Sequence, residues 1–537
     1  MIDTHAAGDT IRSIRASGEE DVLRVAAGAW QIARRKIILN QNVLLARTVG
    51  EGPVMWKKVL LVLAVFGLMP QSGYAQEVNS TLVGIAKTMG AIDLNSLQYT
   101  GSGSTFAPGQ SPSPGMPWPR FNTKSYTRTI NYDTESMRDE IVRTQGDQPP
   151  RGGGGQPVVG EQRQILVVSG THAWNQTGET ITPNWAFATR LHQLWITPHG
   201  VLKAAMAHKA TVQTRTEGNR KLTTIAFVVP SKLKINAHVN ERNLVEKVES
   251  WDTNPVVGDM LTETTYTDYK DFGGVQFPTK IAQKQGGLPS LELTVSDVKP
   301  NAPVDIQVPD NVRQAAVQVK TEKAAEGIWY LTGGSHHSVL IEMQDHLVVI
   351  EGPQHDERAI AVLAEVKRLV PNKPIKYVVN SHHHFDHSGG LGAFVAEDAT
   401  VITHNVNKAF FEQSFAAPRT VNPDKLAQSG KKATVEGIAD KRVLSDATRT
   451  VELYHIQGSI HHDGMIMVYL PKEQLLIEAD AYTPAAPNAP PLAQPNPNHV
   501  NLYENIERLK LAVDRILPIH GRMVPLAELQ KAIGKSS

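Results

Sequence analysis

Residues 381–390, with the sequence SHHHFDHSGG, constrain this chain more than any other stretch, because they place four histidines and one aspartate within six positions. Residues 375–380 before them are mostly apolar, β-branched or aromatic and follow Pro374, which predicts a short buried strand. The glycine pair after them predicts a turn into a helix. The imidazoles and the carboxylate should therefore lie on a loop at the carboxyl end of a strand, where α/β enzymes carry their chemistry. Such a loop can serve two metal ions at once.

The composition excludes several classes of function. At 537 residues the chain is long enough for two or three domains. Its 54 basic and 53 acidic residues nearly balance, so charge gives no reason to expect a nucleic-acid partner. Cysteine is absent, which excludes disulfides, a cysteine nucleophile and cysteine-ligated metals. The 20 histidines are therefore the main candidate ligands for a transition metal.

Residues 55–75 have the order of parts found in a secretory signal peptide. Lys57 and Lys58 precede an apolar run over residues 59–69, and a small-residue cleavage pattern ends at Ala75. The run is shorter than the roughly 20 residues that span a bilayer, and a buried core element is the alternative. Because signal peptides begin at the start codon, we interpret residues 1–54 as an over-extended N-terminus. The mature protein would start near Gln76 and be periplasmic or secreted.

Residues 76–310 predict an antiparallel β-rich domain, because short strand patterns alternate with turn residues. Helices are expected over residues 80–89, with Ser80 as N-cap, and over 183–194 and 201–208. The Gly/Pro-rich stretches 101–119 and 145–157 are interpreted as flexible surface loops. Residues 152–155 are consecutive glycines, but no Lys-Ser/Thr accompanies them, so a linker is favoured over a phosphate-binding loop. Strands are expected at 126–132, 137–143, 164–170, 211–216, 221–229, 232–239, 244–250, 260–270, 275–283 and 291–298.

Residues 269–280, followed by 291–300, resemble half-barrel domains of the periplasmic lipoprotein-carrier type. That resemblance implies an apolar concave face for a lipid, a lipoprotein or the tail of a substrate. The alternative is a packing domain that only shapes the neighbouring active site. Residues 311–326 are interpreted as the linker into the last domain.

Residues 327–537 alternate strand and helix patterns in two similar halves, which predicts two sheets between helices. The fold class expected for the whole chain is therefore α+β. The last domain is similar to the metallo-β-lactamase superfamily, an αββα sandwich of metal-dependent hydrolases. The signature His-x-His-x-Asp-His corresponds to His382, His384, Asp386 and His387. The resemblance implies three further ligands at strand ends, namely His461, Asp480 and His520.

The chemistry of these side chains agrees with that resemblance. Three imidazoles, from His382, His384 and His461, would form a catalytic zinc site with an open fourth position. Asp386, His387 and His520 would form a second site, and Asp480 could bridge both. Two metals about 3.5–4 Å apart can share one hydroxide at neutral pH. Two Zn²⁺ ions per chain are expected, with iron or manganese as alternatives. Asp386 is assigned a catalytic role in addition to its role as a ligand.

Two assignments stay open among the histidines, and a third is made by alternation. His383 should point away from the metals by alternation and is interpreted as structural. The ligand is His461 or its neighbour His462, and Gly464 favours His461 because the family's glycine usually falls three residues after the ligand. His336 and His337 either line the cleft or only cap the sheet.

Departures from the family pattern bear on the reaction. The family often has an aspartate in the turn after the third strand, where this chain has Glu351. Zinc β-lactamases with a cysteine ligand are excluded, and Asp480 fits glyoxalase II-like, lactonase-like and phosphodiesterase-like members better than all-histidine β-lactamases. We expect an exported hydrolase acting on a small-molecule ester, thioester, lactone or similar bond. The alternatives are a non-enzymatic periplasmic lipid- or lipoprotein-binding protein with a structural metal site, and a β-lactamase, phosphodiesterase or sulfatase activity.

Overall fold

The computed structural model describes residues 71–218, 220–487, 489 and 494–535. The N-terminal segment predicted over residues 1–54, and the predicted signal peptide up to residue 70, lie outside these ranges. Residues 76–537 form one compact unit. No helix in the described ranges is both long and apolar enough to cross a membrane.

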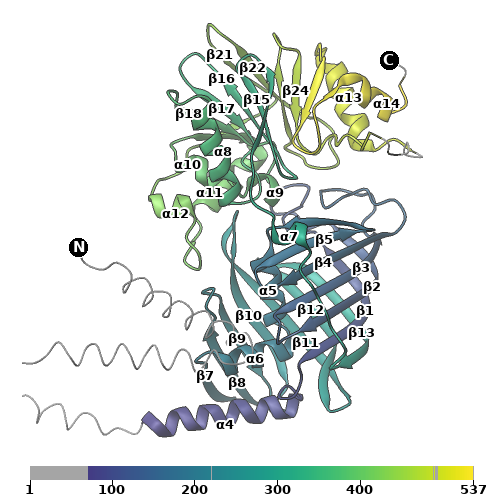
Figure 1. Cartoon of the computed structure of the whole chain (residues 1–537), viewed down its shortest axis with the longest axis vertical. Helices are drawn as coiled ribbons and strands as arrows, with labels where there is room; N and C mark the ends of the chain where they lie inside the picture. The colour runs from purple at the N-terminus through teal and green to yellow at the C-terminus, as the bar shows by residue number, and fades with distance from the viewer. Residues whose placement is uncertain (1–70, 219, 488, 490–493, 536–537) are drawn as a thin grey trace, which may run out of the picture. The chain divides into compact units, whose positions relative to one another are not determined.

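The first part of this unit is a single large antiparallel sheet of 13 strands (Figure 1). Its order is β6-β5-β4-β3-β2-β1-β13-β12-β11-β10-β9-β8-β7, so neighbours in sequence pair, except where β1 and β13 join the two halves. Alternating buried and exposed side chains along the strands give the sheet one core face. The strands are β1 (Ser96–Phe106), β2 (Arg120–Asn131), β3 (Ser136–Gln145), β4 (Gln162–Ser169), β5 (His172–Thr177), β6 (Thr180–Asn184), β7 (Thr211–Glu217), β8 (Arg220–Val228), β9 (Lys234–Val239), β10 (Val245–Asn254), β11 (Gly258–Phe272), β12 (Val275–Gln285) and β13 (Leu288–Pro300).

Three helices accompany the sheet: α4 (Gln71–Met89), α5 (Phe187–Trp195) and α6 (Pro198–Ala207). Their apolar residues join the largest core cluster, together with the inner face of the sheet. The Thr197 side chain caps α6 by accepting a hydrogen bond from the Gly200 backbone N–H at 3.1 Å. A cavity of about 10 Å³ in this core has room for about one water molecule.

Some sequence-based boundaries in this region were wrong. Ser80 lies inside α4 and does not cap its start. The helix predicted from Pro183 begins at Phe187, because Pro183 pairs with Trp174 in the sheet. The stretch predicted as a flexible loop from residue 101 forms the second half of β1 up to Phe106.

The second part of the unit is a four-layer αββα sandwich, which confirms the predicted fold class (Figure 1). One sheet has seven strands, with β17, β18, β19 and β20 in parallel. The other has six strands and is antiparallel except where β24 pairs with β25. The strands are β14 (Lys320–Ala325), β15 (Ile328–Thr332), β16 (Ser338–Glu342), β17 (Leu347–Ile350), β18 (Ile375–Val379), β19 (Thr400–His404), β20 (Val435–Ile438), β21 (Lys441–Ser445), β22 (Thr450–His455), β23 (Ile466–Leu470), β24 (Leu475–Glu478), β25 (Arg515–Pro518) and β26 (Val524–Pro525).

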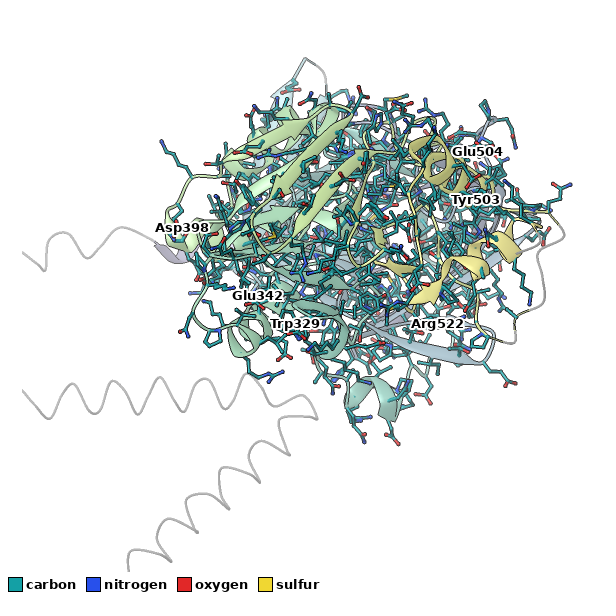
Figure 2. All side chains as sticks on the ribbon, turned by 90° about the horizontal axis from the view of Figure 1, so that it is seen from above. Trp329, Glu342, Asp398, Tyr503, Glu504 and Arg522 are labelled. Atoms are coloured by element: carbon teal, nitrogen blue, oxygen red, sulfur yellow. The ribbon has the colours of Figure 1, made fainter. Side chains whose placement is uncertain are left out.

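Helices cover the outer face of each sheet through separate apolar clusters. In the view from above, Asp398, before β19, and Glu504 of α13 lie at opposite sides of the molecule (Figure 2). The part predicted as a linker is shorter than expected, because residues 320–325 are the first strand of the sandwich. The helices are α7 (Asp310–Arg313), which contacts β5 and β6, then α8 (Asp356–Leu369), α9 (Phe385–Ser388), α10 (Leu391–Val395), α11 (Asn405–Ala416), α12 (Lys425–Ser429), α13 (Pro497–Leu509) and α14 (Leu526–Ala532).

Candidate metal centre

The chemically active side chains of the sandwich stand on loops that follow its strands. The loop after β18 carries the histidine-rich motif, and β17 ends just before Glu351. Asp480 follows β24, and His520 follows its parallel neighbour β25. Since parallel neighbours end at the same edge of a sheet, these loops meet at one place.

Four side chains form a first group of converging ligand atoms, His382, His384, His461 and Asp480. His384 Nδ1 lies 2.9 Å from His382 Nε2 and 3.1 Å from His461 Nε2. His461 Nε2 also lies 2.9 Å from Asp480 Oδ2. All three imidazoles are buried. The sequence grouped the three imidazoles as the first metal site, with Asp480 as a bridge to the second.

A second group contains His336, Asp386, His387 and His520. Asp480 Oδ1 lies 2.9 Å from both His387 Nε2 and His520 Nε2, so its two oxygens face the two groups separately. Asp386 Oδ2 lies 3.2 Å from His336 Nε2. Within the described residues, Asp480 Oδ1 has no hydrogen-bond partner despite these two imidazoles. The lone pairs of Asp480 Oδ1 and of the two imidazoles are directed at a shared point, which fits a cation held between them.

Partners on the far side of each ring fix which nitrogen faces inward. His387 Nδ1 donates to Glu351 Oε2 at 3.0 Å, and His520 Nδ1 donates to the Ser335 carbonyl at 3.1 Å. His384 Nε2 donates to the carbonyl of Ser111 at 2.8 Å. In the neutral form of each ring, a proton committed to an outer partner leaves the inward nitrogen with a free lone pair, as a metal ligand requires. The donor set therefore fits a divalent metal ion.

Glu351 takes the place where the family pattern has an aspartate. Its side chain is fully buried, and besides holding His387 it accepts a hydrogen bond from the Ser381 backbone N–H at the start of the motif loop. Its φ is +67°, a left-handed conformation that costs a side-chain-bearing residue roughly 1–3 kcal/mol. The fold maintains this strain at the point where the carboxylate orients a candidate ligand.

Burial and charge set the protonation of the centre. Burial, with the neighbouring imidazoles, lowers the pKa of His382 and of His384 well below the ordinary value. Burial also disfavours charge on His387, but Asp480 and Asp386 outweigh it and raise the pKa of that imidazole well above its usual range. Burial would raise the pKa of Asp480, but His387, His520 and His461 outweigh it and hold that pKa well below its usual value. The carboxylates are thus ionised and draw positive charge into the site.

A third cluster of imidazoles, His383, His384 and His462, is committed to hydrogen bonds. The Gly464 backbone N–H donates to His462 Nδ1 at 2.8 Å, so the proton of a neutral His462 sits on Nε2 and points at His383 Nδ1, 2.5 Å away. His383 then donates from Nε2 to the Ser111 hydroxyl at 3.1 Å. His383 therefore has the structural role predicted for it, and His461 is the member of its pair that faces Asp480.

Sequence analysis missed several residues of this centre. His336, whose role the sequence left open, joins the second group. Its only signal in the sequence was its position beside a glycine turn that follows a predicted strand. Gln110 donates from its amide to Asp386 Oδ1 at 2.7 Å, and nothing in the sequence indicated it. The run 152–155 is not a flexible surface linker at its start, because Gly152 and Gly153 are buried. A Cβ on Gly153 would lie 2.9 Å from the ring of His384.

Comparisons with known proteins gave one family match and several similar solved structures. Residues 331–514 match the family model described as the metallo-beta-lactamase superfamily. No curated protein matches the chain. Similar solved structures include a metallo-beta-lactamase from Pontibacter korlensis (18% identity, 40% of this chain and 96% of that chain, TM-score 0.31). Others are the rubredoxin oxygen:oxidoreductase of Desulfovibrio gigas (17%, 40% and 61%, 0.32) and the metallo-beta-lactamase FIM-1 of Pseudomonas aeruginosa in its mono-zinc form (18%, 40% and 93%, 0.31). The match to the metallo-beta-lactamase superfamily thus covers residues 331–514, most of the C-terminal sandwich.

Proposed function

We propose that the protein is a metal-dependent hydrolase with two metal sites that share Asp480. The observation that carries the proposal is the position of this carboxylate, with one oxygen 2.9 Å from His461 and the other 2.9 Å from both His387 and His520. A carboxylate between two sets of imidazoles matches a dinuclear hydrolytic centre. The first metal would be held by His382, His384 and His461, and the second by Asp386, His387 and His520, with His336 beside it.

Two divalent metals at such a centre supply an activated water at neutral pH and a Lewis acid for the oxygen of the bond under attack. The chain's own residues keep these ligands in place. Burial of His382, His384 and His387 excludes water from the inner side. The carboxylates supply negative charge that offsets the charge of two cations.

Substrate is proposed to approach from the side of the second group. Asp386 and His520 have side chains that are 36% and 21% exposed, whereas those of His382 and His387 are fully buried. An open groove of about 570 Å³ adjoins this side, and Gly334, His337 and Gly521 are among its lining residues. A groove of this size suits a small molecule such as an ester, thioester or lactone. Because imidazole and carboxylate ligands suit zinc, zinc is the proposed metal, with iron or manganese as alternatives.

Export to the periplasm or beyond is part of the same proposal and rests on the sequence of residues 55–75. N-terminal sequencing of the native protein should begin near Gln76. Recovery of residues 1–54 in the mature protein would refute both the signal peptide and the over-extended start.

The test of the reaction class combines metal analysis with a substrate screen. Purified protein, stripped by a chelator and reloaded with Zn²⁺, Fe²⁺ or Mn²⁺, is assayed on esters, thioesters, lactones, β-lactams, phosphodiesters and sulfate esters. We expect hydrolysis of one class, lost on chelation and restored by zinc. His520→Ala should lose the second metal, while the control His238→Ala, on β9 away from the centre, should keep both. Full activity of the stripped protein refutes the proposal. A lipid that co-purifies with a protein inert in every assay would instead support the binding-protein alternative.

A further inference from the structure

Two loops of the large antiparallel sheet contact the metal centre. The first follows β1 (residues 107–113), and the second lies between β3 and β4 (residues 151–155); we call them the loop pair. Both lie outside residues 331–514, which match the superfamily. The second loop is attached to the first, because Gly153 N–H donates to the Gln110 carbonyl at 3.0 Å and Gly154 N–H donates to Gln110 Oε1 at 2.9 Å.

Backbone contacts join the loop pair to the loops that carry the ligands. The Asp463 N–H donates to the Pro112 carbonyl at 2.8 Å, and the Gly152 N–H donates to the Ile460 carbonyl at 2.9 Å. Phe385 N–H donates to the carbonyl of Gly109 at 3.3 Å. Any side chain at Gly109, where φ is +74°, would overlap the Phe385 ring, since a Cβ there would lie 2.2 Å from it. The backbone of the loop pair is thus in direct contact with two loops that carry candidate ligands, the motif loop at Phe385 and the loop at residues 460–463.

Gln110 contributes its side chain to the centre. Because its Oε1 accepts the Gly154 N–H, the amide orientation is settled and Nε2 donates to Asp386 Oδ1 at 2.7 Å. This bond occupies one carboxylate oxygen and leaves Oδ2, which faces His336 and His387. Asp386 is the most exposed candidate ligand of its group, so its orientation depends on such a partner.

We propose that Gln110 is a positioning residue for the second metal site, so that the β-rich domain completes the active site of the sandwich. This inference rests on the proposed function, because it assigns Asp386 as a ligand. Gln110 acts through Asp386, whereas the Ser111 carbonyl acts on the first site through His384. Loss of the Gln110 amide alone should therefore weaken the second site and spare the first.

The test measures metal binding without any substrate. Metal-free full-length protein is titrated with Co²⁺, and the visible absorption bands report the two sites as they fill. We expect Gln110→Met, which keeps the length of the side chain but removes both the donor to Asp386 and the acceptor of the Gly154 N–H, to weaken the lower-affinity Co²⁺ by about 10-fold and to change its absorption band. The first Co²⁺ should bind as in the wild type. Gln110→Ala, tested in parallel, should have the same effect if the Met variant does not fold.

Gln145→Ala is the matched control. Gln145 holds the chain on both sides of the second loop, because its Oε1 accepts the Val158 N–H at 2.8 Å and its Nε2 donates to Asp147 and Gln156, but it contacts no candidate ligand. It should bind both Co²⁺ ions normally. Equal binding in wild type and Gln110 variants overturns this inference and leaves the proposed function standing. Equal weakening of both sites also overturns it, because it indicates a collapsed loop pair. A wild type that binds no second Co²⁺ refutes the proposed two-metal function, and this inference with it.

Discussion

Two buried clusters of charge in this protein differ in how their carboxylates are satisfied. In the large sheet, Arg128 Nε and Nη2 each donate to a different oxygen of Asp139 at 2.7 Å, and the Tyr126 hydroxyl donates to Oδ2 at 2.9 Å. In the sandwich, Asp480 is surrounded by imidazole nitrogens, and within the described residues its Oδ1 has no hydrogen-bond partner. The first cluster is complete as an ion pair. The second needs a cation, which distinguishes a site for metal from a structural pair.

The largest expected effect comes from removing the shared carboxylate. Asp480→Ala should lose both metals and lower turnover by more than about 100-fold, since even partners outside the ligands contribute about 10- to 100-fold. Metal content per chain and activity on the substrate found by screening are the measurements. Asp398→Ala, which removes an exposed carboxylate, is the control. Retention of two metals by Asp480→Ala would remove the basis of the comparison.

The structural pair should respond in stability and not in metal content. Asp139→Ala leaves Arg128 buried without its partner and should lower the free energy of unfolding by about 3–5 kcal/mol. Asp268→Ala breaks an exposed pair with Lys280 and should lower the free energy of unfolding far less. Denaturant unfolding of the metal-free and of the metal-loaded protein measures both losses. A metal-dependent stability loss in Asp139→Ala would contradict a purely structural role for the pair.

A smaller effect should follow from Glu351, which stands between the two kinds of carboxylate because it is buried and fully bonded yet holds a candidate ligand. In Glu351→Gln, an amide NH₂ group replaces one of the two oxygens and faces either the Ser381 N–H or the His387 N–H. Both of these groups are donors, so the amide NH₂ cannot accept a hydrogen bond from either. We expect the second site to bind Co²⁺ about 10-fold more weakly. Glu351→Asp, the residue common in the family, is the informative companion, and unchanged affinity in the Gln variant would show that His387 needs no such partner.

Local patterns predicted much of the fold and the candidate ligands. Apolar runs such as residues 347–350 and 375–379 are strands because they lie in the interior of the sandwich, where most of their side chains are buried, and Glu351 and the motif loop follow these two runs. Gln110 could not be predicted, because 276 residues separate it from Asp386 and only the packing of two sheets brings them together. The glycines at 152 and 153 were misread for the same reason. A run of glycines is equally compatible with a flexible linker and with a close approach between two segments of the chain, and only the tertiary contacts decide between them.

The pairing of β1 with β13 has a consequence for the order in which the protein assembles. Leu97 pairs with Pro300, so the large sheet cannot close until the residues between them, about two fifths of the chain, have been synthesised. The loop pair, which lies at the ends of strands of this sheet, can then contact the candidate ligands only after the chain from His336 to His520 has been made. Contacts so distant in sequence form slowly. The protein should therefore take up its metals as the last step of folding, and partly made chains should bind them poorly.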